Sequence, residues 1–150
     1  MQSPYKNRNR SEWQTITEDL IKAHPLKEQD LIDAVFAAWD GIFNTMLAGK
    51  LKIGTDIHMK PQEIGSFLHA LIPYELEQRF PSDWRRDKSG DEKDIVCVAD
   101  NNFSIEIKTS SNKTRIFANR SYAQDTTDAK KSKTGYYLAV NFENTTEKRD

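Results

Sequence analysis

The clearest structural signal in the chain is the run Asp94-Ile95-Val96-Cys97-Val98-Ala99-Asp100-Asn101-Asn102-Phe103-Ser104-Ile105-Glu106-Ile107-Lys108-Thr109. Residues 94–99 are mostly apolar, residues 100–102 have the composition of a turn, and residues 103–109 alternate between apolar and polar side chains. This pattern predicts a β-hairpin. We expect its first strand to be buried on both faces. The second strand should present on one side Ser104, Glu106 and Lys108.

Two helices are predicted upstream of the hairpin. Apolar residues recur at steps of three and four over residues 30–47, and Gly49 is expected to stop this helix. A second helix should cover residues 61–80, and Pro73 should kink or split it. The apolar stripe of the first helix suits burial within its own domain or against a second copy of the chain, and we favour the first of these.

The remaining segments predict the outline of the fold. Residues 82–93 should form a short strand or a loop at the surface, and residues 125–131 a helix. A further buried strand is expected over residues 135–142. The order of elements indicates an α+β (α/β layered) fold, in which helices flank a small mixed β-sheet.

Length and composition limit the architecture to one domain. The 150 residues carry 22 Lys+Arg and 23 Asp+Glu, a net charge of -1, which excludes a globally basic protein. The polar residues 1–11 are expected to be a flexible N-terminal arm, and residues 12–150 a single domain. Because residues 143–150 are polar, we expect that elements of the native domain are missing after them, or are supplied by a partner.

The same composition predicts a protein of the cytoplasm. Cys97 is the only cysteine and cannot form an internal disulfide. The chain has no apolar run of 18 residues and no secretory signal at its start, so no membrane partner is expected. Three histidines have no zinc-binding spacing with Cys97 and are expected to be structural or surface residues: His24, His58 and His69.

The hairpin predicts a cluster of charged side chains on one face of the sheet. Glu106 and Lys108 are two residues apart in a strand and therefore lie on the same face. If Ala99 pairs with Phe103, the numbers of paired residues sum to 202, and Asp94 lies opposite Lys108 on that face. A two-residue turn would give an odd sum and would place Asp94 on the other face. The hypothesis of a shared site therefore depends on the register.

This cluster suits metal-assisted hydrolysis of a phosphodiester. Mg²⁺ prefers oxygen ligands and needs only one or two protein carboxylates, so Asp94, Glu106 and the backbone carbonyl of Ile107 are the candidate ligands. Lys108 would orient the attacking water or stabilise the charge that develops on the phosphate. The alternative is that Glu106 and Lys108 are only a solvent-facing ion pair. We favour the catalytic interpretation.

The segment after the hairpin is suited to DNA. Residues 108–133 contain seven Lys/Arg and two Asp, a local excess of +5 in a chain whose net charge is -1. The candidates for phosphate contacts are Lys113, Arg115 and Arg120. The candidates for reading base edges are Asn119, Arg120, Tyr122 and Gln124. A charge run of this kind is more often only a solvated surface, but its position beside the candidate metal site favours binding.

These motifs resemble a known superfamily. Asp94, an eleven-residue gap and then Glu106-Ile107-Lys108 are similar to the Asp…(Asp/Glu)-x-Lys signature of the PD-(D/E)xK nucleases, which include most type II restriction endonucleases. The proline of that motif is replaced here by Lys93. Residues 55–142 resemble more narrowly the restriction endonucleases of the ScaI type.

The resemblance implies a restriction-endonuclease-like core, Mg²⁺ dependence and a homodimer that cuts both strands of DNA. It also implies a metal-binding role for an acidic residue on the helix before the sheet, a place that Glu63 occupies in this chain. Glu63 is equally suited to a structural role, since an acidic residue is favoured in the first turn of a helix.

The sequence thus predicts a Mg²⁺-dependent deoxyribonuclease, and within that class a type II site-specific restriction endonuclease. Two alternatives stay open. One is a nuclease of DNA repair or recombination that recognises a DNA structure, and the other is a non-catalytic module that binds nucleic acid.

Overall fold

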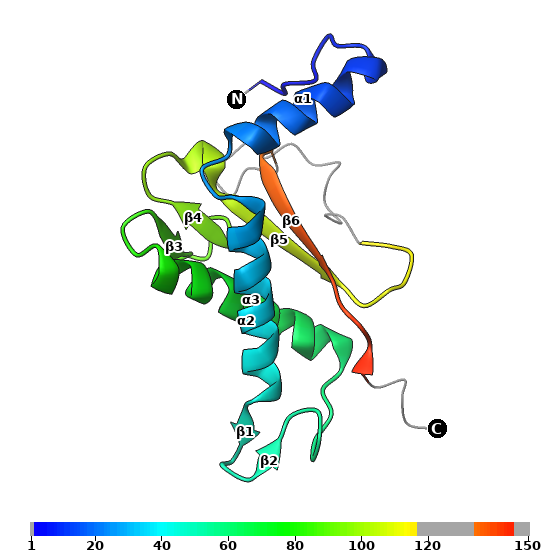
Figure 1. Ribbon diagram of the computed structural model, residues 1–150, viewed down its shortest axis with the longest axis vertical. Helices are drawn as coiled ribbons and strands as arrows, with labels where there is room; N and C mark the ends of the chain where they lie inside the picture. The colour runs from blue at the N-terminus through cyan, green and yellow to red at the C-terminus, as the bar shows by residue number, and fades with distance from the viewer. Residues whose placement is uncertain (1, 117–133, 146–150) are drawn as a thin grey trace.

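The computed structural model describes residues 2–116 and 134–145. Three α-helices, six β-strands and one 3₁₀ helix follow one another in these residues (Figure 1). In chain order they are α1 Arg10–Ala23, α2 Glu28–Phe43, β1 Met46–Leu47, β2 Leu51–Lys52, α3 Pro61–Arg79, β3 Trp84–Arg86, β4 Ile95–Cys97, the 3₁₀ helix Asn101–Phe103, β5 Ile105–Ser110 and β6 Tyr136–Asn141. None of these helices is long and apolar enough to cross a membrane.

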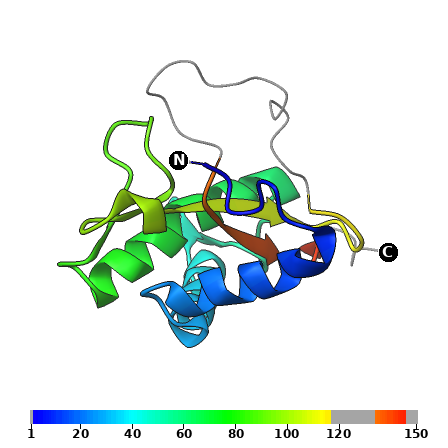
Figure 2. The same cartoon turned by 90° about the horizontal axis from the view of Figure 1, so that it is seen from above.

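A four-stranded mixed sheet is the centre of the fold. Its strand order is β3-β4-β5-β6, with antiparallel pairs β3/β4 and β4/β5 and a parallel pair β5/β6. Helix α3 packs against β3 and β5, and α2 crosses α3 (Figures 1 and 2). The apolar core joins α2, α3 and the sheet through side chains such as Ala38, Leu68 and Ile107, each at most 1% exposed. The predicted α+β fold with a mixed sheet is confirmed.

Helix α2 is shorter than its apolar pattern predicts. It ends at Phe43 and is capped by Asn44, so the expected continuation to residue 47 is wrong. Met46 and Leu47 instead form β1, which pairs with β2 in a small hairpin. Gly49 lies in the turn of this hairpin with φ 66°, a left-handed conformation that glycine adopts without strain. An apolar run with a period of three to four therefore continued past the true end of the helix.

Helix α3 continues through its internal proline. Pro73 lies inside the unbroken helix Pro61–Arg79, so the prediction that it could split the helix is wrong. Proline removes one backbone hydrogen bond from a helix interior. Ile72 and Leu76 on either side of it are fully buried, and burial of such side chains stabilises the fold by about 1.5–3 kcal/mol each. Packing against the sheet thus offsets the lost hydrogen bond.

Helix α1 has no counterpart among the predicted elements. Its narrow apolar stripe, formed by Trp13, Ile16 and Leu20, contains no buried residue. Its start is nevertheless marked by polar residues, because the backbone N–H of Asn9 donates to Glu12 Oε2 at 2.9 Å. In the N-terminal arm, the Tyr5 hydroxyl lies 2.8 Å from Thr17 Oγ1 of α1. The flexibility of residues 1–11 stays a prediction.

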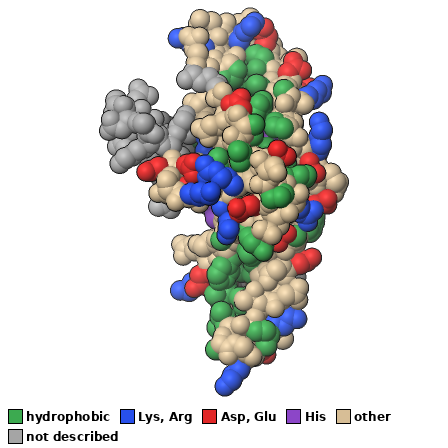
Figure 3. All heavy atoms as spheres, turned by 90° about the vertical axis from the view of Figure 1, so that its left-hand side faces the viewer, with side chains coloured by type: hydrophobic (Ala, Val, Ile, Leu, Met, Phe, Trp, Pro, Cys, Tyr) green, Lys and Arg blue, Asp and Glu red, His purple; other side chains and the backbone are tan. Residues whose placement is uncertain are grey.

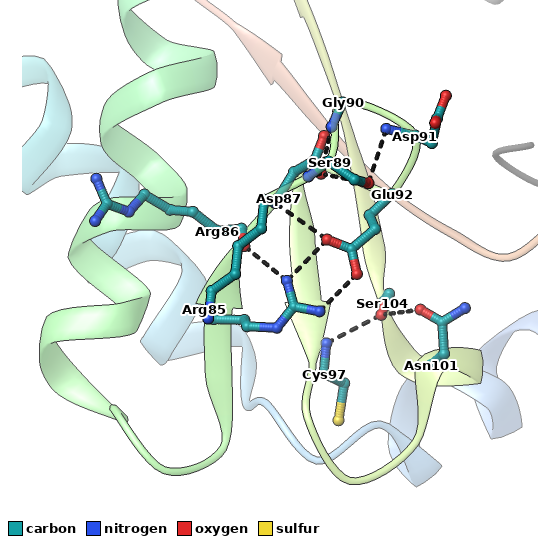
Figure 4. A network of polar contacts seen from close by, with 11 residues as sticks. Arg85, Arg86, Asp87, Ser89, Gly90, Asp91, Glu92, Cys97, Asn101 and Ser104 are labelled. Atoms are coloured by element: carbon teal, nitrogen blue, oxygen red, sulfur yellow. Dashed lines mark hydrogen bonds and ion pairs between the residues drawn. The ribbon is translucent and has the colours of Figure 1, made fainter.

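The hairpin of β4 and β5 has the predicted face but a shifted register. Ile95 pairs with Ile105, so paired numbers sum to 200 instead of the expected 202. In the connection, the buried Ser104 accepts a hydrogen bond from the Cys97 backbone N–H at 3.0 Å, and its Oγ donates to Asn101 Oδ1 at 2.9 Å (Figure 4). The side chain of Ser104 thus replaces a backbone partner at the end of the ladder. The sum of the paired residue numbers is still even, so the same residues share a face of the sheet as predicted.

The two strands that flank β5 differ in burial. All three residues of β4 are buried, as predicted. The prediction of a buried strand over residues 135–142 is only half right, since β6 alternates between covered and exposed residues and Tyr137 is 42% exposed. Strand β6 comes last in the strand order and pairs with β5 alone.

Candidate active site

Asp94 is held at the edge of the sheet, directly before β4. Its Oδ2 accepts a hydrogen bond from the Ile107 backbone N–H at 2.7 Å, so a carboxylate takes the place of a backbone carbonyl in the ladder. When the Ile95/Ile105 pairing is extended by one residue, Asp94 lies opposite Glu106. The expected position opposite Lys108 is wrong by two residues. Asp94 and Glu106 nevertheless lie on one face, as the hypothesis requires.

Glu106 and Lys108 form an ion pair in a protected environment. Lys108 Nζ lies 3.0 Å from Glu106 Oε1, and the two side chains are 22% and 12% exposed respectively. Glu106 is among the few buried charged residues of the described chain. A buried carboxylate is costly unless a cation or hydrogen-bond donors compensate for it. The ion pair of the structural alternative is present, but it is partly shielded from water and does not face the solvent fully.

The backbone carbonyl of Ile107 also points towards this edge. In a β-strand, the N–H and the C=O of one residue point towards the same neighbouring strand. The Ile107 N–H donates to Asp94, so the carbonyl of Ile107 also lies on the Asp94 side. Ser110, an odd number of residues further along, has its carbonyl on the opposite side, where it accepts from the Phe142 N–H at 3.0 Å.

One residue near the carboxylates was missed in the sequence. His69 of α3 places its Nδ1 3.5 Å from Asp94 Oδ2. The sequence suggested only a structural or surface role for it. No sequence signal marks His69, but it lies one turn after Gly65, at which a Cβ would lie 2.8 Å from Thr109 Oγ1 of β5. That close approach shows which side of α3 faces the sheet.

Glu63 lies at the start of α3 and stabilises the helix end. Its Oε2 accepts a hydrogen bond from the Lys60 backbone N–H at 2.7 Å, and the residue is exposed. This is the contact of a capping box, the structural role that the sequence also allowed. Its metal-binding role stays a prediction.

The candidate DNA-binding residues fall in two groups. Lys113 and Arg115 are exposed in the loop after β5. The loop is fixed by hydrogen bonds from Ser110 Oγ to the Arg115 carbonyl at 2.7 Å and from Asn141 Nδ2 to the Asn112 carbonyl at 2.8 Å. Outside the described residues lie Asn119, Arg120, Tyr122 and Gln124, and the helix predicted over residues 125–131.

The donor atoms at this edge fit a hard divalent cation. Within residues 2–116 and 134–145, no group of three or more His, Cys, Asp or Glu side chains is arranged to hold a metal ion. The arrangement instead offers the carboxylates of Asp94 and Glu106 and the carbonyl of Ile107, all of which are oxygen donors. Mg²⁺ is typically bound through one or two carboxylates, with water and substrate oxygens completing its shell.

Two carboxylates and a lysine on neighbouring positions of a small mixed sheet, with helices packed against it, define the restriction-endonuclease-like class of proteins. The chain belongs to the ScaI restriction endonuclease family, whose model matches residues 3–150. The type II restriction enzyme ScaI of Streptomyces caespitosus is 46% identical over 142 residues, which cover 94% of this chain and 62% of that enzyme. The chain thus spans less than two thirds of this relative. No solved structure matches the chain significantly.

Proposed function

We propose that the chain is a Mg²⁺-dependent endonuclease that hydrolyses DNA phosphodiester bonds, as a type II site-specific restriction endonuclease. The observation that carries the proposal is the even register of the β4/β5 hairpin, which sets Asp94 opposite Glu106. Lys108 lies 3.0 Å from Glu106. Membership of the ScaI restriction endonuclease family supports the same activity.

Three oxygen donors would hold the cation: the carboxylates of Asp94 and Glu106 and the carbonyl of Ile107. A bound Mg²⁺ would supply charge to polarise the scissile phosphate and would lower the pKa of a water molecule. In the hydrolysis, the water oxygen forms a bond to phosphorus and the bond from phosphorus to the leaving deoxyribose oxygen breaks. The attacking water loses a proton and the leaving oxygen gains one.

Lys108 would stabilise the charge that develops during this reaction. Its ammonium group has three hydrogen-bond donors, and the contact with Glu106 Oε1 uses one of them. Lys108 can therefore hold Glu106 and a phosphate oxygen, or the attacking water, at the same time. In a partly buried site such a positive charge acts more strongly than in water.

DNA binding is assigned to the loop after β5 and to the basic residues that follow it. Lys113 and Arg115 would contact phosphates, and Asn119, Arg120, Tyr122 and Gln124 would contribute phosphate and base contacts.

On the face that carries β3, by contrast, acidic and basic side chains are interspersed (Figure 3). Double-strand cleavage would use a homodimer, since two symmetric sites can each cut one strand. The enzyme would act in the cytoplasm, where its substrate DNA is found.

Incubation of plasmid DNA with the protein, in Mg²⁺ or in EDTA, tests the proposal. Discrete fragments that appear only with Mg²⁺ support a site-specific endonuclease. Cleavage confined to branched or damaged DNA would indicate a repair or recombination nuclease instead. Binding without cleavage at any Mg²⁺ concentration would contradict the enzymatic proposal and would indicate a binding module.

A further inference from the structure

Two contacts converge on one oxygen of Asp94. The Ile107 backbone N–H donates to Oδ2 at 2.7 Å, and His69 Nδ1 lies 3.5 Å from the same oxygen. The two contacting groups come from different elements, β5 and α3. A carboxylate group rotates easily about its last side-chain torsion, whose energy profile is broad. The Ile107 N–H fixes the position of one oxygen, and the His69 contact from a second direction also restricts the plane of the group.

Helix α3 is placed firmly enough to give His69 this role. Gly65, one helical turn before His69, approaches β5 so closely that a Cβ would lie 2.8 Å from Thr109 Oγ1. Thr109 follows Lys108 in the same strand. The distance between α3 and the site is therefore set by direct contact. The His69 and Asp94 side chains are 35% and 20% exposed, so their contact is partly shielded from water.

We propose that His69 is a positioning residue for Asp94. Its Nδ1–H donates to Oδ2 and, together with the Ile107 N–H, orients the carboxylate for cation binding. This inference rests on the proposed function, in which Asp94 is a ligand of the cation. Partners that hold a metal-binding side chain in place typically contribute 10–100-fold to metal affinity. We therefore assign to His69 an effect on cation affinity, without direct contact with the cation or the DNA.

The test compares three variants of the full chain. His69→Ala removes the donor. His69→Asn keeps an N–H donor close to the position of Nδ1, and Gln62→Ala changes an exposed residue of the same helix. Isothermal titration calorimetry with MnCl₂ measures cation binding without turnover. Fluorescence anisotropy in EDTA measures affinity for a mixed-sequence DNA duplex, and thermal unfolding checks that each variant is folded.

We expect His69→Ala to raise the Kd for Mn²⁺ by about 10–100-fold, with DNA affinity in EDTA unchanged. His69→Asn should recover most of this loss, and Gln62→Ala should match the wild type. Mn²⁺ affinity in His69→Ala equal to that of the wild type would overturn the inference. If His69→Ala does not fold, His69→Asn becomes the deciding variant. A Kd for Mn²⁺ raised as far as 100-fold in folded His69→Asn would contradict a role of His69 that depends only on its N–H donor.

Asp94→Asn separates failure of this inference from failure of the proposed function. If Asp94→Asn abolishes Mn²⁺ binding while His69→Ala does not affect it, only the role of His69 is wrong. If Asp94→Asn binds Mn²⁺ as well as the wild type does, the proposed cation site is itself wrong.

Discussion

Two glutamates of this small domain are paired with basic residues in different ways. Glu92, in the loop between β3 and β4, accepts from Arg85 Nη1 at 2.8 Å and from Arg85 Nη2 at 2.5 Å (Figure 4). The Lys88 backbone N–H also donates to it, at 3.1 Å. Glu106, in β5, has one oxygen 3.0 Å from Lys108 Nζ. The first pair engages both carboxylate oxygens, and the second is a contact between one oxygen and one ammonium.

The difference separates an ion pair that holds a loop from one that is suited to chemistry. A bidentate arginine–carboxylate pair is rigid and geometrically specific, and the one at Glu92 fixes the loop before Asp94. Lysine is a flexible point charge that can change partners. Glu106 is also the more buried of the two residues. Loss of Glu92 should thus affect mainly stability, whereas loss of Glu106 should affect mainly cleavage.

The largest effect is expected from Glu106→Ala. Removing a candidate ligand of the cation should lower DNA cleavage by about a thousand-fold or more, since a bound metal ion contributes several kcal/mol to transition-state stabilisation. Cleavage of plasmid DNA in Mg²⁺ measures the loss, and DNA affinity in EDTA should change little. Glu92→Ala is the matched control and should keep near-normal cleavage. Equal losses in the two variants would remove the distinction between the pairs.

Lys108→Ala should have the next largest effect. Without the ammonium group, cleavage should fall by roughly a hundred-fold, while the fold and DNA affinity stay largely intact. Single-turnover cleavage at saturating Mg²⁺ is the appropriate measurement. Lys88→Ala, which changes an exposed lysine of the β3–β4 loop, serves as the control. Normal cleavage by both Lys108→Ala and Glu106→Ala would refute the assigned site.

Gly65→Ala tests whether the site depends on the close packing of α3 against β5. The added methyl would lie 2.8 Å from Thr109 Oγ1, so we expect the free energy of unfolding to fall by about 1–3 kcal/mol. Gly41→Ala in α2 is the matched control, because its Cβ would meet only Leu71 Cδ1 at 3.9 Å. That change should raise stability by roughly 0.5–1 kcal/mol. Urea denaturation measures the free energy of unfolding of both variants. Stabilisation by Gly65→Ala would show that α3 can move away from β5 to make room for the methyl group.

The smallest effect concerns stability in acid. Hydrogen bonds from Arg85, and then from the Lys88 N–H, lower the pKa of Glu92 from 4.5 to about 2. A carboxylate whose pKa is lowered by folding stabilises the fold above its unfolded pKa, and this contribution is lost as the pH falls towards the folded pKa. Wild-type stability should therefore decline between about pH 4.5 and pH 2 partly through Glu92. In Glu92→Gln this part of the decline should be absent, and an unchanged slope would argue against the pairing.

Local patterns in the sequence were sufficient to predict the face of the sheet on which a residue lies, where that face depends on strand geometry alone. Glu106 and Lys108 could be placed on one face because alternate residues of a strand share a face. The face of Asp94 depended only on whether the register sum was even, so it was correct although the register was shifted by two residues. The shift occurs next to a hydrogen bond from the Cys97 N–H to Ser104 Oγ, a contact that no local pattern predicts.

Other features depended on contacts between distant segments or gave only a weak or misleading apolar signal. His69 and Asp94 meet only because α3 packs on the sheet, and they are 25 positions apart in the sequence. Helix α1 buries no residue, and its short apolar stripe of Trp13, Ile16 and Leu20 was not assigned to a helix. The end of α2 was overestimated because Met46 and Leu47 continue its apolar rhythm while forming a strand. Tertiary packing, which local patterns do not reveal, brings His69 to Asp94.

The central claim is that Asp94, Glu106 and the carbonyl of Ile107 hold one divalent cation. A crystal structure of the protein with MnCl₂, with anomalous diffraction recorded at the manganese edge, tests it most directly. We predict one anomalous peak within coordination distance of both carboxylates and the Ile107 carbonyl oxygen, with Lys108 beside it. A peak elsewhere, or none at this edge of the sheet at saturating Mn²⁺, would contradict the claim.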